Sequence, residues 1–145
     1  MVTVFETSVI DAPVDEVWQV VRGFNNLAKW HPAIDRSEIE DGLDPMTIGC
    51  IRNFYLADGE NVRETLLAFS EADLSFSYDM LTTGLGLLDY FSTMELSPIT
   101  DGNRTYIQWT AEFNTAEGEE EAKTELVAKG VFQGGFAALK QHFSK

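Results

Sequence analysis

The chain has 145 residues, of which 44% are hydrophobic and 12% aromatic, and it carries a formal net charge of −14. A chain of this length and composition can bury a stable core without disulfides or bound metals. We therefore expect one domain over residues 1–145 and no extended disorder. The acidic surface repels phosphate backbones and anionic lipids, which makes nucleic acids and membrane surfaces poor partners.

The sequence also bears on the compartment and on the metal chemistry of the protein. Residues 1–6 lack a basic region followed by a long apolar stretch, and no run of 18 apolar residues occurs later. We therefore expect a cytoplasmic protein that does not insert into membranes. The single cysteine, Cys50, excludes an intramolecular disulfide and a cysteine-based zinc site.

Hydrophobic periodicity predicts a strand, two short helices and another strand in the first 40 residues. The first strand covers residues 2–10, and Pro13 stands where a first helical turn tolerates proline. Apolar residues at helical spacing then predict a helix that ends near residue 22. A second short helix is expected at residues 25–29, and a strand follows at 34–40.

Further strands follow, and alternating polarity identifies several of them. Residues 74–80 alternate apolar and polar side chains, which is typical of a sheet with one solvent-exposed face and one buried face. The last strand covers residues 105–113. Turn sequences at Asp58–Gly59 and at Asp101–Asn103 predict hairpins between consecutive strands.

A helix from about residue 119 to residue 143 completes the order β-α-α-β-β-β-β-β-β-α. Strands grouped between terminal helices indicate an α+β fold with one antiparallel sheet. A helix of about 25 residues is about 37 Å long at 1.5 Å per residue. We expect only a curved sheet to bury so long an apolar face in so small a protein.

This order, with a set of landmark residues along the whole chain, resembles the helix-grip (SRPBCC) superfamily. That superfamily includes START domains, birch-pollen-allergen-like proteins and polyketide cyclase/dehydrase proteins, and within it the chain is most similar to the bacterial branch related to the plant abscisic-acid receptors. The landmarks are Ile10–Trp18, Phe24–Pro32, Gly49–Arg52, Glu64–Leu66, Ser77–Tyr78, Trp109 and Phe136–Leu139.

The resemblance implies a fold, a cavity and a set of residues that line the cavity. The expected fold is a curved, antiparallel, seven-stranded sheet wrapped around a long C-terminal helix, with two short helices between the first two strands. A large apolar cavity between sheet and helix would hold a small lipid-, polyketide- or isoprenoid-like molecule. The expected ligand-binding residues are Arg52, Phe54, Leu56, Val62, Glu64, Tyr78, Met80, Tyr90, Ser92, Trp109, Val127, Val131 and Gly135.

Arg52 and Glu64 are charged residues on strands whose neighbouring side chains are apolar. Burying a charge is costly unless it is paired. A two-residue turn at Asp58–Gly59 would place the two charges on opposite faces, whereas a three-residue loop would place them on the same face. The resemblance favours the same face. The pair would then be either a polar anchor for a ligand or a structural ion pair, in which the two charges only compensate each other.

Two further segments invite an explanation in terms of a cavity. The terminal helix contains Gly130, Gly134 and Gly135, which either leave room for a ligand or allow close packing or a kink. The apolar, glycine-rich segment from Thr83 to Leu88 is expected to form a lip at the cavity mouth. The lysine with which the receptors pair a ligand carboxylate corresponds here to Asp35, which favours a neutral or cationic ligand.

Signals for catalysis are few. His31 and His142 are the only histidines, and no nucleophile stands at a suitable spacing from them. We expect no metal site and no cofactor, because clustered ligands and phosphate-binding glycine loops are missing from the sequence. If the protein is an enzyme, the candidate acid or base groups are Arg52, Glu64 and Tyr78.

Three functions therefore stay open at this stage. The first is binding of a small hydrophobic ligand without chemistry, which the cavity signals favour. The second is a polyketide cyclase or aromatase, which would use Tyr78, Arg52 and Glu64. The third is a protein-interaction module of stress or chaperone type, whose acidic surface would bind a partner.

Overall fold

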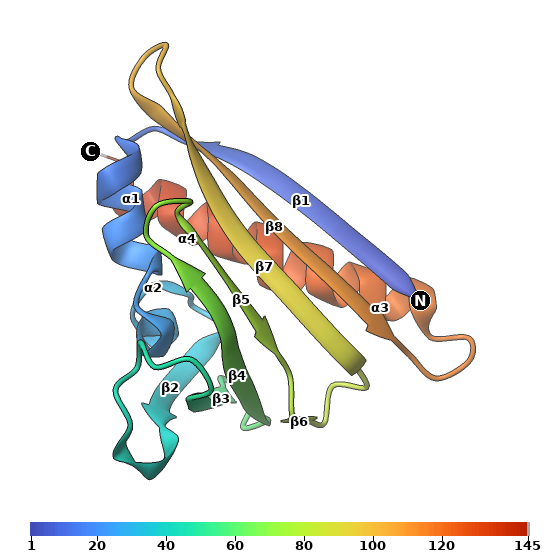
Figure 1. The fold of residues 1–145 in the computed structure, drawn as a ribbon. Coiled ribbons are helices and arrows are strands. Elements are labelled where there is room, and N and C mark those ends of the chain that lie inside the picture. The colour runs from blue at the N-terminus through green and yellow to red at the C-terminus, as the bar shows by residue number, and fades with distance from the viewer. Residues whose placement is uncertain (145) are drawn as a thin grey trace.

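A computed structural model describes residues 1–144 and shows one curved antiparallel sheet with a long helix along it (Figure 1). The strands follow the order β1-β8-β7-β5-β4-β3-β2, and β6 pairs with β4 beside this path. Within these residues the strands are β1 (Val2–Ile10), β2 (Ile34–Ile39), β3 (Ile51–Leu56), β4 (Asn61–Ser70), β5 (Ser75–Asp79), β6 (Thr82–Thr83), β7 (Leu88–Ile99) and β8 (Arg104–Asn114).

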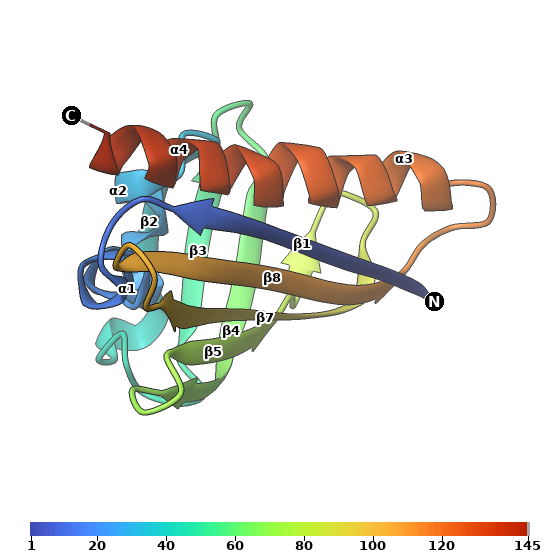
Figure 2. The same ribbon diagram turned by 90° about the horizontal axis from the view of Figure 1, so that it is seen from above.

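The long C-terminal helix is composed of three consecutive segments. It runs beside β1 along the curved sheet (Figure 2). The segments are α3 (Glu120–Glu125), a π-helical segment (Leu126–Gln133) and α4 (Gly134–Phe143). The sequence predicts one helix over these residues but not the π-helical geometry of its middle, which contains Gly130.

Short helices follow the first strand, as the sequence predicts. They are α1 (Val14–Val21), a 3₁₀ turn (Phe24–Asn26) and α2 (Leu27–Trp30), and a further 3₁₀ turn covers Glu40–Gly42. The helix-grip fold is thereby confirmed. The sheet gains one short strand beyond the seven expected, because Thr82 and Thr83 pair with β4. No helix among residues 1–144 is long and apolar enough to cross a membrane.

The hairpin between β3 and β4 decides the relative orientation of Arg52 and Glu64. The amide of Leu56 donates to the carbonyl of Glu60, so the loop contains three residues, 57–59. Gly59 closes it with a φ of +94°, a conformation that glycine adopts without the steric cost of a Cβ. In this register Arg52 lies directly opposite Glu64, and both side chains point to the concave face.

Large aromatic side chains fill much of the space between sheet and helix. The rings of Trp109 on β8 and Phe132 on the helix stack with their centroids 4.5 Å apart. Gly135 lies against the same indole, where an added Cβ would stand 2.9 Å from Cζ3 of Trp109. This end of the helix therefore packs closely on the sheet.

A candidate ligand-binding cavity

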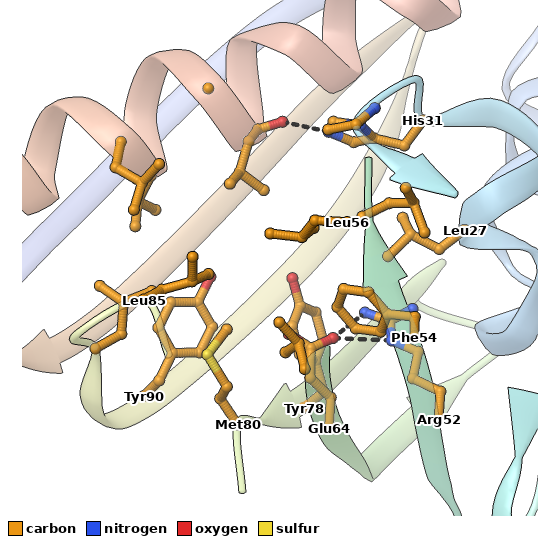
Figure 3. A pocket seen from close by; sticks show the side chains of 18 of the residues that line it. Leu27, His31, Arg52, Phe54, Leu56, Glu64, Tyr78, Met80, Leu85 and Tyr90 are labelled. Atoms are coloured by element: carbon orange, nitrogen blue, oxygen red, sulfur yellow. Dashed lines mark hydrogen bonds and ion pairs between the residues drawn. The ribbon is translucent and has the colours of Figure 1, made fainter. Parts of the chain in front are cut away.

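A cavity of about 210 Å³ lies between the sheet, the long helix and α2 (Figure 3). Its lining residues are spread along the chain from Leu27 to Val131, which explains why no short motif identifies it. Most of its wall is apolar, and the polar members are His31, Arg52, Glu64, Tyr78 and Tyr90. The other lining residues are Leu27, Ala33, Ile34, Phe54, Leu56, Val62, Met80, Leu85, Leu87, Trp109, Leu126, Val127, Gly130 and Val131.

Arg52 and Glu64 form a buried ion pair at one end of the cavity. The Nε atom of Arg52 donates to Oε1 of Glu64 over 2.8 Å, and a terminal nitrogen lies 2.7 Å from the same oxygen. The other terminal nitrogen donates to the backbone carbonyl of Phe24 over 2.8 Å. The side chains are only 3% and 5% exposed, so the charges are held by each other and by the backbone rather than by bulk water.

Aromatic rings cover the guanidinium group of Arg52. Its central carbon lies 4.0 Å from the ring centroid of Phe24 and 4.7 Å from that of Tyr78. These contacts add cation–π attraction to the ion pair. Burial raises the pKa of Glu64, and the neighbouring guanidinium of Arg52 opposes that shift.

A second polar group is formed by Tyr78 and Trp109. The indole Nε1 of Trp109 donates to the hydroxyl of Tyr78 over 2.9 Å, and both side chains are buried. Burial, followed by the nearby charge of Glu64, raises the pKa of Tyr78 to about 12. Burial also raises the pKa of Tyr90 well above its usual value. Both phenols are therefore neutral near pH 7.

His31 links the connection between α2 and β2 to the long helix. The amide of Ala33 donates to its Nδ1 over 3.2 Å, so Nδ1 is the acceptor and the ring proton lies on Nε2. That Nε2 donates to the carbonyl of Val131 over 2.7 Å. Burial lowers the pKa of His31, and the positive charge of Arg52 contributes in the same direction.

Most of the residues predicted to bind a ligand line this cavity. Two do not. Ser92 lies opposite Tyr78 on the neighbouring strand β7, where it is fully buried and donates to the carbonyl of Thr110 over 2.7 Å. Gly135 lies beyond the cavity, because the side chains of Trp109 and His31 occupy the space beside it. The residues that do line the cavity are Arg52, Phe54, Leu56, Val62, Glu64, Tyr78, Met80, Tyr90, Trp109, Val127 and Val131.

Sequence reasoning missed the lining residues that come from α2 and from the connection into β2. Leu27, His31 and Ile34 come from α2 and the chain that follows it, where no periodicity marks a buried face. Leu85 and Leu87 also line the cavity, and they belong to the glycine-rich segment that the sequence analysis expects at the cavity mouth.

Two expectations about ligand chemistry need correction. Asp35 is exposed at a β-bulge of β2 and does not line the cavity, so it cannot select the charge of a ligand there. The cavity is also smaller than the resemblance implies, since typical ligand pockets hold about 300–1,000 Å³. The packed rings of Trp109 and Phe132 occupy part of the space.

Among residues 1–144, no cluster of His, Cys, Asp and Glu could hold a metal ion.

Comparison with known proteins identifies the family. A family model described as polyketide cyclase / dehydrase and lipid transport matches residues 1–144. The chain belongs to this family. Family and fold together place it among the hydrophobic ligand-binding or polyketide cyclase-type proteins of the SRPBCC superfamily. The narrower likeness to the abscisic-acid receptors is not tested by these comparisons and stays a prediction.

Solved structures agree with the family over nearly the whole chain. The protein XoxI from Bacillus cereus is 26% identical with a TM-score of 0.89, over 99% of this chain and 96% of that one. Ara h 8.0201 is 22% identical with a TM-score of 0.76, over 97% and 96%. A norcoclaurine synthase mutant from Thalictrum flavum, in complex with a transition-state analogue, is 17% identical with a TM-score of 0.74, over 97% and 92%. The last two show the fold alone.

Proposed function

We propose that this protein binds a small hydrophobic molecule of about one ring in the cavity between the sheet and the long helix. The supporting observation is a largely apolar cavity with a buried ion pair, Arg52 and Glu64, at one end. Apolar walls supply affinity, and a few polar groups fix the orientation of a ligand. An apolar cavity of about 150 Å³ accepts benzene, so about 210 Å³ suits a single ring with a short substituent.

The geometry favours binding over catalysis by Tyr78 or Arg52, two of the candidate groups that the sequence analysis selects. A general acid works best when its pKa lies near the operating pH. The pKa of Tyr78 is raised to about 12, and its hydroxyl already accepts a hydrogen bond from Trp109. Arg52 is paired with Glu64 and with the backbone. These groups are arranged to hold the cavity and a ligand rather than to transfer a proton.

Native mass spectrometry of gently purified protein tests this proposal. We expect a small apolar adduct in a one-to-one ratio, and organic extraction would identify its chemical class. Val131→Phe places a ring on a cavity-lining position and should reduce the adduct at least tenfold. Ala137→Phe places the same ring on an exposed position of α4 and should leave it unchanged. Equal occupancy in both variants would contradict binding in this cavity.

A further inference from the structure

The carboxylate of Glu64 uses only one of its two oxygens within the protein. Both nitrogens of Arg52 that reach it lie against Oε1, at 2.8 and 2.7 Å. Among residues 1–144, every fully buried side-chain nitrogen or oxygen has a hydrogen-bond partner. Oε2 has no such partner, so it is not fully buried and opens into the cavity that Glu64 lines. A carboxylate oxygen of this kind accepts hydrogen bonds.

The positive partner of this pair is much less available to a ligand. Arg52 donates from Nε to Glu64 and from one terminal nitrogen to the carbonyl of Phe24, and its other terminal nitrogen forms the ion pair with Glu64. The rings of Phe24 and Tyr78 lie over its guanidinium plane. The polar end of the cavity therefore presents a hydrogen-bond acceptor with negative charge, whereas the matching positive charge is already engaged.

We propose that Oε2 of Glu64 selects single-ring ligands that carry an O–H or N–H donor, in preference to ethers, hydrocarbons and carboxylates of the same size. This inference rests on the proposed function, because it names the ligand class of the same cavity. Hydrogen bonds to a charged group are the stronger ones, and a site built for a donor rejects analogues that lack it. We expect discrimination of about 10- to 100-fold.

Titration calorimetry with four matched compounds tests the selectivity at pH 7. The compounds are 4-propylphenol, 4-propylanisole, propylbenzene and 4-propylbenzoate. The phenol should bind about 10- to 100-fold more tightly than the anisole and the hydrocarbon, and the benzoate should bind most weakly. Equal affinities for the phenol, the anisole and the hydrocarbon would overturn the selectivity but not the proposed function. Failure of all four to bind would overturn both.

Two variants locate the selectivity at Glu64. In Glu64→Gln the amide oxygen can accept from Arg52, so that the amide nitrogen turns toward the cavity. The cavity would then present a donor instead of an acceptor, and the preference should shift from the phenol to the anisole. The matched change Glu38→Gln, at an exposed position of β2, should have no effect.

A double variant covers the case in which Glu64→Gln fails to fold. Arg52→Met with Glu64→Met removes the pair without leaving a buried charge, and such replacements are often tolerated. It should bind the phenol, the anisole and the hydrocarbon with affinities within about threefold of one another. A phenol preference that persists in this double variant would overturn the inference.

Discussion

The Nε2 atom of His31 lies 2.7 Å from the carbonyl oxygen of Val131, and this contact joins the chain after α2 to the π-helical segment of the long helix. Both residues line the cavity. Because Nδ1 accepts from the amide of Ala33, the arrangement requires a neutral ring. Protonation of Nδ1 would remove that acceptor and place a positive charge near Arg52.

His31 should make the protein less stable as the pH falls below about 6.5. Burial lowers its pKa in the folded state, so the unfolded chain binds more protons between the folded pKa and the usual value of 6.5. The free energy of unfolding should therefore decrease in that window by up to about 1.4 kcal/mol per pH unit.

Urea denaturation between pH 7.5 and 5 would measure this dependence. His31→Gln removes the titrating group, and its stability should fall less steeply with acid than that of the wild type. His142→Gln, at an exposed position, is the control and should follow the wild type. Parallel profiles for wild type and His31→Gln would show that another group causes the acid sensitivity.

The buried pair of Arg52 and Glu64 should show strong coupling in a double-mutant cycle. Removing one partner alone leaves an uncompensated buried charge, so Arg52→Met or Glu64→Met should each cost about 3–5 kcal/mol. The double variant should be near neutral, because two apolar side chains need no partners. Chemical denaturation of all four proteins measures the coupling. Additive single effects would mean that the charges do not depend on each other.

Tyr78→Phe should destabilise the protein by about 1–3 kcal/mol, because it removes the acceptor of the buried indole N–H of Trp109. The indole proton resonance of Trp109 should also shift upfield in the variant. Tyr106→Phe, at a half-buried position on β8, is the matched control and should change stability by less than about 0.5 kcal/mol. A resonance that does not move would contradict the hydrogen bond.

The two helix glycines Gly130 and Gly135 should respond oppositely to alanine. An added Cβ at Gly130 meets only Leu126, at 3.7 Å, so Gly130→Ala should stabilise the helix by up to about 1 kcal/mol. At Gly135 the Cβ would stand 2.9 Å from the ring of Trp109 and 3.1 Å from that of His31, so Gly135→Ala should cost about 1–3 kcal/mol. Thermal unfolding of both variants measures these effects. Equal shifts of the two unfolding temperatures in the same direction would refute this packing.

Much of the cavity wall could be predicted because it belongs to strands. In β3, Arg52, Phe54 and Leu56 share one face, as the alternation of side chains in a strand requires. The pairing of Arg52 with Glu64 could not be derived from that alternation alone. It depends on whether the loop after β3 has two or three residues, and both loops are compatible with the Asp58–Gly59 sequence.

The sequence by itself determined the order of the strands and helices along the chain and the antiparallel sheet around the long helix, because these follow from local periodicity and turn chemistry. The family resemblance, rather than periodicity, indicated which strand residues face the cavity. Tertiary structure alone decided three further features. Trp109 and Phe132 stack and reduce the cavity, Gly135 packs against Trp109 rather than lining it, and His31 reaches Val131 across 100 positions of the chain. These outcomes depend on which side chains compete for the same space, and that competition has no local signature in the chain.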